Sequence, residues 1–374
     1  MGAMARWQRF VLIGVAALAV SAVVVAIALR SPRVIALMVE RQARQVFGTA
    51  RNPDLFDGKA LRVILCGTSS PLADPNRAKA CTMVIAGGRA YVVDTGPESA
   101  KTLGIMGFPF ERIDGVFLTH FHSDHFGGLG EFRLFAWIGG RQRALPVYGP
   151  AGVEKITAGF NLAYEMDDRH RADHHGPDIA HTGASLLEPR PFAVGASQTR
   201  DKSEVILDED GLKITAFEVN HLPVRPAVGY RFDYKGRSVV ISGDTTKWHS
   251  VAAAAKGADI LVHEAQAQNI RKIIADAADA AGNKRAAKLM RDIESYHASP
   301  VDAAEIANEA GVKLLVYSHF TPPLNSTLLY PLFFDGVAAK RATSGWVAGF
   351  DSMRIDLPIG SDAIVQSRVK AVGE

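Results

Sequence analysis

The most pronounced hydrophobic pattern in the chain is one uninterrupted apolar segment near the amino terminus. Residues 10–29, FVLIGVAALAVSAVVVAIAL, contain no charged side chain. A helix of this length spans about 30 Å, the thickness of the apolar core of a bilayer. A cleavable signal peptide would have a shorter apolar region and a small-x-small cleavage site, whereas this segment runs into RSPR at 30–33. The pattern predicts an uncleaved transmembrane anchor, with residues 1–33 forming a cytosolic stub and the span.

The basic residues around this span bear on its orientation. Counting Lys and Arg alone favours a cytoplasmic carboxyl side, because more of them follow the span than precede it. A short head with two arginines and a free amine is, however, typical of an inward-pointing start. We expect a single-pass protein of the cytoplasmic membrane, with the large domain on the periplasmic or extracellular side. The flanking residues are Arg6 and Arg9 before the span and Arg30, Arg33, Arg41 and Arg44 after it.

Two further segments separate the span from the rest of the chain. Residues 34–47 mix apolar residues with arginines and predict a juxtamembrane helix, and the Gly, Asn, Pro and Asp residues of 48–58 predict a linker. We therefore expect one juxtamembrane and linker segment over 34–58 and one large domain over 59–374.

Short apolar runs separated by turn residues predict the strands of that domain. Runs at 81–86 and 89–93 flank Gly87-Gly88, and runs at 227–234 and 238–241 flank a Lys-Gly-Arg turn, so each pair predicts a hairpin. From Val251 onward, alanine-rich helical stretches alternate with short strands. Hairpins followed by strand–helix alternation predict an α/β architecture with a mixed sheet. The remaining strand candidates are 61–65, 116–118, 212–219, 260–262 and 314–317, and the helical stretches are 251–256, 265–281 and 301–310.

Residues 159–200 do not fit this regular pattern. They are polar and rich in helix-breaking residues, so we expect an insertion that forms a long loop. The alternatives are a solvated surface loop, a lid over a substrate pocket, or adventitious metal capture by its histidines, which are His170, His174, His175 and His181.

Composition narrows the protein class but says little about chemistry. With 374 residues, 48% hydrophobic and 22% charged, the chain is neither disordered nor a coiled coil. Two cysteines, Cys66 and Cys81, exclude a disulfide-stapled scaffold and a cysteine-rich zinc finger. The net charge is only +3 and no basic run stands out, so we expect no nucleic acid partner.

A histidine cluster carries the chemistry. The sequence THFHSDHFGG at 119–128 follows a predicted strand. His120 and His122 are two residues apart, so both imidazoles face one side of an extended segment, and Asp124 and His125 follow around a turn. Four such groups cannot all serve one tetrahedral ion that keeps an open position. Two adjacent ions are the economical arrangement, and His with carboxylate suits zinc, with iron or manganese as alternatives.

A two-metal site needs further ligands from elsewhere in the chain. His221, Asp244 and His319 each lie just past the end of a predicted strand. Side chains at the carboxyl ends of strands commonly form the sites of α/β proteins. These three residues are therefore the candidates to complete the site.

This order of residues resembles the metallo-β-lactamase-fold hydrolases over most of residues 60–357. The resemblance implies an αββα sandwich, a bridging role for Asp244, and support of the ligand loop by Asp94. The β-lactamases that use a cysteine ligand differ from this chain, because neither cysteine lies at a ligand position. The implied ligands are His120, His122 and His221 for one metal, and Asp124, His125 and His319 for the other.

Within that family the chain is most similar to ribonuclease Z and its arylsulfatase-like and phosphodiesterase relatives. GTSSP at 67–71, HEA at 263–265 and HASP at 297–300 resemble their motifs. The resemblance implies that Glu264 and His297 assist proton delivery to the leaving group, and we count Asp124 with them as catalytic. For His297, a helix-capping neighbour without a chemical role is the alternative.

Several departures from ribonuclease Z shape the functional expectation. Gln266 replaces a threonine, TPP at 321–323 replaces an Arg-Tyr pair, and no Gly/Pro-rich tRNA-binding arm is evident. We therefore expect a membrane-anchored dinuclear zinc hydrolase that cleaves a phosphodiester or sulfate ester through a metal-bridging hydroxide. The alternatives are a lactonase or carboxyl-ester hydrolase and, third, a non-catalytic metal-binding membrane protein.

The expected partners follow from that reading. They are a small-molecule or lipid-like ester substrate, the bilayer through residues 10–29, and a second copy in a homo-oligomer. The carboxyl segment 326–350 is rich in Leu, Phe, Tyr and Trp. It is either core packing or an apolar wall that receives a lipid-like substrate.

Overall fold

The computed structural model of the chain describes residues 52–181, 183–194 and 202–370, together with 29–48 and scattered positions between residues 7 and 26. The chain divides into two compact units, one up to Asn52 and one over Pro53–Ala371. The predicted boundary near Lys59 remains a prediction.

The first unit contains helix α2 (Pro32–Gly48), which has charged residues along its length. Arg44 and Glu40 form an exposed ion pair one turn apart, with 2.6 Å between nitrogen and oxygen. Such residues are costly in hydrocarbon. α2 covers most of the segment in which we expected a juxtamembrane helix.

Among the residues that the structure describes, no helix is both long and apolar enough to cross a membrane. This finding contradicts the predicted anchor over 10–29, and with it the single-pass topology, the bilayer as a partner and the predicted location in the cytoplasmic membrane. Parts of 10–29, such as residues 12–13, 16–17 and 23–24, lie outside the described residues.

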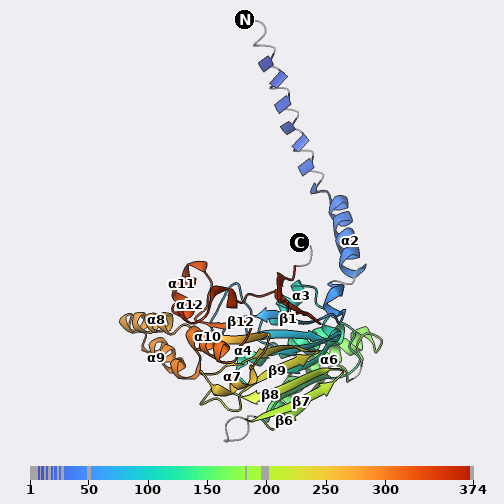
Figure 1. Cartoon of the computed structure of the whole chain (residues 1–374). Coiled ribbons are helices and arrows are strands. Elements are labelled where there is room, and N and C mark those ends of the chain that lie inside the picture. The colour runs from blue at the N-terminus through green and yellow to red at the C-terminus, as the bar shows by residue number, and fades with distance from the viewer. Residues whose placement is uncertain are drawn as a thin grey trace. The chain divides into compact units, whose positions relative to one another are not determined.

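The second unit is built on two β-sheets (Figure 1). The first has the order β15-β14-β1-β2-β3-β4-β5-β6 and the second β13-β12-β11-β10-β9-β8-β7. The first sheet contains β1 (Ala60–Gly67), β2 (Cys81–Ala86), β3 (Arg89–Val93), β4 (Ile113–Phe117), β5 (Leu145–Pro150), β6 (Leu187–Phe192), β14 (Met353–Pro358) and β15 (Val365–Arg368). The second contains β7 (Ser203–Glu209), β8 (Leu212–Glu218), β9 (Val228–Tyr234), β10 (Arg237–Ile241), β11 (Ile260–Gln266), β12 (Leu314–Thr321) and β13 (Trp346–Ala348).

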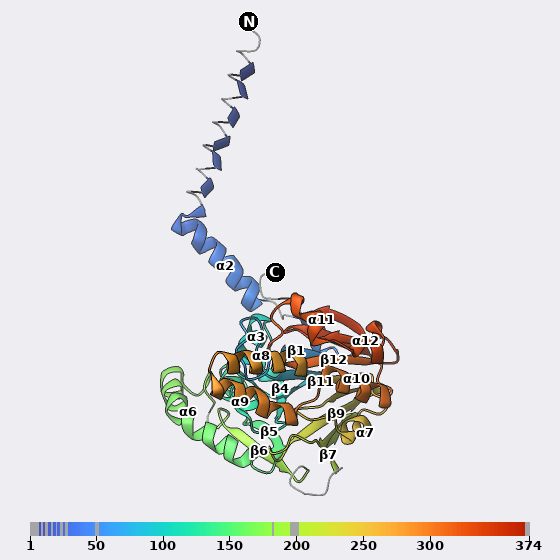
Figure 2. The ribbon, with the colours of Figure 1, turned by 90° about the vertical axis from the view of Figure 1, so that its left-hand side faces the viewer.

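Helices cover the outer faces of both sheets, which confirms the predicted αββα arrangement. Residues of the first sheet pack against α3 and α5, and residues of the second against α7 and α10. α6 runs along β5 and β6 (Figure 2). The helices that follow strands of the first sheet are α3 (Ser99–Ile105), α4 (Ser123–Phe126), α5 (Leu129–Ile138) and α6 (Val153–His175). The helices in the part of the chain that forms the second sheet are α7 (His249–Ala254), α8 (Gln268–Ala280), α9 (Lys284–Asp292), α10 (Pro300–Glu309), α11 (Tyr330–Phe333) and α12 (Val337–Lys340). Short 3-10 turns are η1 (Pro53–Phe56), η2 (Phe110–Arg112), η3 (Ile293–Tyr296), η4 (Thr327–Leu329) and η5 (Thr343–Gly345).

The predicted hairpins are confirmed, and the predicted loop over 159–200 is not. Residues 81–86 and 89–93 form β2 and β3, which pair in antiparallel register. Within 159–200, however, residues up to His175 belong to the helix α6, and 187–192 form β6. The helix is stabilised by an Arg171–Asp167 ion pair one turn apart and by Arg133 of α5, which binds Asp168.

Aromatic rings fill the space between the two sheets. Phe117, at the end of β4, is fully buried and stacks on Tyr148 with ring centroids 4.6 Å apart. Its edges contact Tyr230 and Phe232 of the facing sheet. The last residue of β4 is thus fixed from both sides, and the segment that follows it is the histidine cluster.

We expect Phe117→Ala to lower the free energy of unfolding by about 3–5 kcal/mol, because it removes a ring that the surroundings cannot refill. Urea unfolding followed by circular dichroism measures this. The matched control is Phe135→Ala, because Phe135 is 41% exposed and should cost less than half as much. Equal losses for the two variants would show that the inter-sheet core is not where the packing energy lies.

Candidate metal centre

The segment after β4 gathers four of the predicted ligands. His120 and His122 meet at 2.9 Å between Nε2 and Nδ1. Asp124 and His125 then lie in the single turn of α4, and both are buried. The backbone here is fixed from the second sheet, because the Thr119 carbonyl accepts a hydrogen bond from the amide of Val228.

The other three predicted ligands arrive from the second sheet. His221 follows β8 and Asp244 follows β10. His319 lies inside β12, where the pairing with β11 shifts register by one residue and the backbone of His319 has a φ of 48°. Such a bulge turns one side chain away from its normal direction, and here it brings His319 towards Asp124.

One carboxylate oxygen, Oδ2 of Asp244, lies at the centre of the cluster. Four of the predicted histidine ligands place Nε2 within 4 Å of it, and His297 places Nδ1 at 4.0 Å. Asp244 is only 3% exposed, so its charge is not screened by water. The Nε2 distances are 3.4 Å for His125, 3.6 Å for His319, 3.8 Å for His221 and 3.9 Å for His120.

These side chains form groups whose ligand atoms lie within 4.8 Å of one another. The predicted ligands fall into two such groups, which matches a dinuclear site. A third group combines Asp244 and His319 with His297, which we had assigned to proton delivery. The first two groups are His120, His122, His221 and Asp244, and Asp124, His125 and His319.

The hydrogen bonds of the imidazoles support the same interpretation. His125 donates from Nδ1 to Asp94 Oδ2 at 2.8 Å, and His221 donates from Nδ1 to the carbonyl of Tyr296 at 2.8 Å. Each bond fixes the ring and leaves Nε2 directed to the centre. His125 Nε2, which faces the centre, is buried without a hydrogen-bond partner among the described residues. Buried polar atoms without partners fit a site built for cations, so the residues fit a pair of metal ions.

The electrostatics of the site favour the protonation states that metal binding needs at His120, His221 and Asp244. At His125 burial lowers the pKa, but the carboxylates of Asp244, Asp124 and Asp94 outweigh it and raise that pKa well above its usual value, so a metal ion has to displace a proton there. Burial lowers the pKa of His221 to about 4, and burial together with the neighbouring His125 lowers the pKa of His120 strongly. Both rings are then neutral. Burial raises the pKa of Asp244, but the surrounding histidines outweigh it and hold that pKa well below its usual range, so Asp244 is ionised. Neutral imidazoles and ionised carboxylates are the forms that bind metal.

Asp94 contacts both ends of the predicted ligand loop. It follows β3 and has a φ of 59°. Its carboxylate accepts from the Thr119 amide at 2.9 Å and the Thr119 hydroxyl at 2.8 Å, in addition to His125. One buried carboxylate thereby orients the start and the end of the THFHSDH segment.

Glu264 and His297 lie side by side at the edge of the cluster. His297 Nδ1 is 2.9 Å from Glu264 Oε1 and 3.0 Å from Oε2. Burial lowers the pKa of His297, but the charge of Glu264 and its hydrogen bond raise it, and the net pKa is raised. Glu264 is held in turn by the amide of Thr245 at 2.9 Å. The resulting pair can hold a proton next to Asp244.

Two residues that support the site were not found from the sequence. The Thr119 hydroxyl donates to Asp94, and its Oγ1 lies 3.1 Å from His120 Nδ1. Because Thr119 directly precedes the first histidine of the cluster, its position in the sequence could have indicated this role. Tyr296 contributes a backbone carbonyl to His221, and its ring lies against that imidazole with centroids 4.7 Å apart. Every residue has a backbone carbonyl, so the sequence alone cannot show which carbonyl binds a ligand residue.

The histidines of the 159–200 segment do not join the cluster. His170, His174 and His175 belong to the exposed part of α6, and none of the metal-type groups formed by the described residues contains them. Metal capture by that segment thus has no support among these residues.

Comparisons with known proteins agree with this geometry. The model of the β-lactamase superfamily domain matches residues 89–320. The ribonuclease Z of Mycobacterium bovis is 34% identical over 267 residues, which covers 71% of this chain and 87% of that protein. The chain belongs to the metallo-β-lactamase superfamily, in its ribonuclease Z group. The ribonuclease Z of Mycobacterium avium matches over the same shares of both chains, again at 34% identity.

Solved structures show the same fold at low sequence identity. Human tRNase Z, short form, superposes with a TM-score of 0.56 at 21% identity, covering 80% of this chain and all of that one. The metallo-β-lactamase fold protein YhfI from Bacillus subtilis gives 0.55 at 20% identity, covering 79% and 99%. The chain therefore has the metallo-β-lactamase fold over nearly the full length of both structures.

These relatives overturn three expectations from the sequence. The relatives named above are ribonucleases, which contradicts the predicted hydrolysis of a small phosphodiester or sulfate ester. It also contradicts the predicted small-molecule or lipid-like substrate and the expected absence of nucleic acid. In the carboxyl segment 326–350, Phe333, Phe334 and Val337 are buried in the core, as core packing predicts, whereas Leu328 is 88% exposed.

We expect Asp244→Ala to reduce the metal content from about two ions per chain to one or fewer, because it removes the carboxylate that both ligand groups share. Elemental analysis of dialysed protein measures this. His174→Ala, on the exposed side of α6, is the matched control and should keep two ions. Two ions retained by Asp244→Ala would refute the shared role of that carboxylate.

Proposed function

We propose that this chain is a metal-dependent ribonuclease that hydrolyses a phosphodiester bond in RNA of the tRNA class. One observation carries the proposal: the Glu264–His297 pair lies beside Asp244 and a complete two-metal donor set. The chain is 34% identical to the ribonuclease Z of Mycobacterium bovis, and the match covers 87% of that protein. The substrate class comes from that relative, and the chemistry comes from the site.

Two zinc ions are the proposed cofactors. His120, His122 and His221 would hold one, Asp124, His125 and His319 would hold the other, and Asp244 would serve as a ligand of both. The donor set is rich in imidazole, which suits zinc better than a site made of carboxylates alone. When bound, such ions supply an activated water molecule and neutralise negative charge on the phosphate. Iron or manganese in the same positions is an outcome that metal analysis would distinguish.

His297 is the proposed proton donor to the leaving oxygen. Its Nδ1 is bound to Glu264, so Nε2 is the nitrogen free to donate. The carboxylate of Glu264 stabilises the imidazolium and so keeps a proton available at neutral pH. After the bond breaks, the proton resides on the leaving hydroxyl and His297 is neutral.

Glu264 orients the His297 ring and stabilises its protonated form. It lies in β11, and its carboxylate is held at Oε1 by the Thr245 amide, directly after Asp244. This couples the position of the proton donor to the position of the shared ligand. Asp124 is proposed as a ligand that is also catalytic, because its Oδ2 lies 3.2 Å from His319 Nε2 and 3.4 Å from His125 Nε2 at the same centre.

The proposal is tested with labelled RNAs of matched length: a mature tRNA, a tRNA transcript extended at both ends, an unstructured RNA, and the DNA copy of the extended transcript. We expect the purified chain to cleave the extended tRNA at least tenfold faster than the unstructured RNA or the DNA. Chelation should abolish cleavage, and zinc should restore it. His120→Ala should be inactive, and His174→Ala should match the wild type. Cleavage of DNA at an equal rate, or activity in His120→Ala, would refute the assignment.

The role of His297 has a separate test that uses the leaving group. We expect His297→Ala to slow cleavage of normal RNA by about 10²–10⁴-fold, the usual contribution of a positioned acid. With sulfur in place of the leaving oxygen, the variant should lose less than tenfold, because a thiolate departs without a proton. Metal content, measured in parallel, should be unchanged. Equal losses on both substrates would show that His297 does not deliver the proton.

A further inference from the structure

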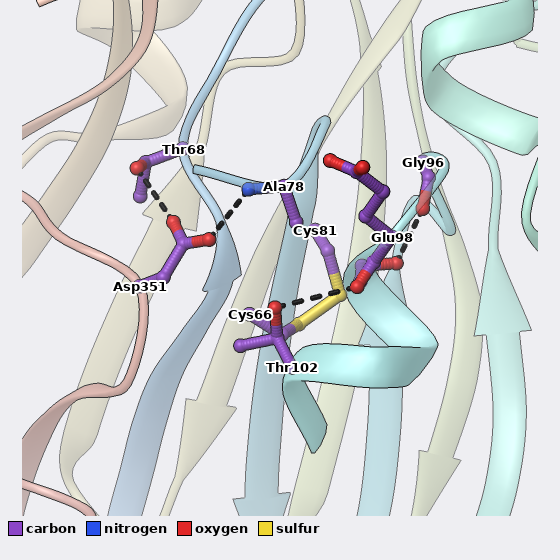
Figure 3. The surroundings of a disulfide bond; sticks show 9 residues. Cys66, Thr68, Ala78, Cys81, Gly96, Glu98, Thr102 and Asp351 are labelled. Carbon is purple, nitrogen blue, oxygen red and sulfur yellow. Dashed lines mark hydrogen bonds between the residues drawn. A yellow bond between two sulfur atoms is a disulfide. The ribbon is translucent and has the colours of Figure 1, made fainter. Parts of the chain in front are cut away.

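A disulfide bond closes a loop next to the metal centre. Cys66 in β1 and Cys81 in β2 are bonded, with Cα atoms 5.0 Å apart, and both are buried (Figure 3). The pairing of the two strands shifts register between Leu65 and Gly67, so Cys66 lies at an irregular point of the ladder. The disulfide fixes the strands there, at the two ends of the loop 67–80.

A buried carboxylate holds the same loop from the other side. Asp351 accepts from the Thr68 hydroxyl at 2.7 Å and from the Ala78 amide at 2.6 Å, so it joins the start of the loop to its end (Figure 3). Arg77 adds a hydrogen bond to the Thr68 hydroxyl at 2.7 Å and one to the carbonyl of Gly349 at 2.8 Å. The loop 67–80 is therefore held together near its two ends, by the disulfide and by Asp351.

On one side the loop binds the residue after His319. The Phe320 amide donates to the carbonyl of Thr68 at 3.0 Å, and Phe320 forms an isolated bridge with Ser69. The Arg77 guanidinium lies 4.8 Å from the centre of the Phe320 ring. His319 itself has a positive φ, a conformation that needs support from its surroundings. The loop supplies that support at the next residue.

On the other side the loop packs against the segment that holds Asp124 and His125. The Gly96 amide donates to Ala80, and the Thr95 amide donates to the carbonyl of His125 at 2.6 Å. Gly96 lies so close to both partners that a Cβ atom there would be 2.3 Å from the Asp124 carbonyl oxygen and 2.6 Å from Lys79. Only glycine fits between the loop and the ligand turn, so a shift of the loop moves that turn.

We propose that the Cys66–Cys81 disulfide is a positioning element for one half of the metal centre. Acting through the loop 67–80, it would set the three donors Asp124, His125 and His319. None of the hydrogen bonds found among the described residues joins this loop to His120, His122 or His221. Opening the disulfide should therefore weaken one of the two ions selectively. This inference depends on the proposed two-metal site and not on the RNA substrate.

The test measures zinc binding to the full chain by competition with a chromophoric chelator. In Cys66→Ala/Cys81→Ala we expect one of the two ions to bind at least tenfold more weakly and the other to stay within about threefold, in line with the effect of residues that orient ligands. Leu187→Ala, a buried change in β6 at the edge of the first sheet, is the control for lost stability and should leave both affinities unchanged. Equal weakening of both ions, no change in either, or the same selective loss in Leu187→Ala would overturn the proposal.

The affected ion is identified by removing each half of the site in turn. With His122→Ala, the remaining ion is held by Asp124, His125 and His319, and the cysteine changes should still weaken it. With His319→Ala, the remaining ion lies on the other side, and the same changes should have no effect. The reverse pattern would contradict the proposed route through the loop.

A second pair of variants keeps the proposal testable if the cysteine variant does not fold. Asp351→Ala removes both bonds that join the start of the loop to its end, whereas Asp351→Asn can accept from the Ala78 amide and bond to the Thr68 hydroxyl. We expect the alanine variant to reproduce the selective loss of one ion and the asparagine variant to restore its affinity to within about threefold. Unchanged binding in Asp351→Ala would show that the loop does not position the site. If the wild-type chain itself does not bind two ions, the proposed two-metal site is wrong, whatever the variants show.

Discussion

The architecture depends on keeping one carboxylate charge buried among imidazoles. Asp244 is almost fully enclosed, and its Oδ2 has five histidine nitrogens within 4.0 Å. A buried charge is costly unless it is paired and hydrogen-bonded, so the segments that supply its partners must end at fixed positions. Those segments follow β4 and β8, lie in β12, or join η3 to α10, and they connect to both sheets. The aromatic core around Phe117 and the bond from Val228 to Thr119 keep the two sheets in the register that this convergence requires.

The sequence was informative where the local pattern decides the structure. The ligands His221 and Asp244 could be placed because strand and turn signals precede them directly, and the hairpin of β2 and β3 follows from two apolar runs around Gly87-Gly88. The helix α6 could not be predicted in the same way, since its polar residues form a helix partly through the distant Arg133. The carbonyl of Tyr296 and the strand irregularity at Cys66 depend on tertiary contacts, which no sequence spacing reveals.

Two physical arguments from composition led to wrong expectations. Hydropathy over 10–29 favoured a membrane span, but no helix among the described residues is long and apolar enough for one. The low net charge of +3 argued against nucleic acid, yet a donor set that takes two divalent cations brings positive charge directly to a phosphate. A surface rich in lysine and arginine is therefore not required at such a site. The membership in the ribonuclease Z group corrects the partner expectation on this point.

The most direct test of the central claim is anomalous X-ray diffraction from crystals of the zinc-loaded chain, recorded on both sides of the zinc absorption edge. The account predicts two strong anomalous peaks. One should lie among His120, His122 and His221, the other among Asp124, His125 and His319, and both should be within bonding distance of the Asp244 carboxylate. A single peak, or peaks that do not contact Asp244, would contradict the assignment of this cluster as a two-metal centre.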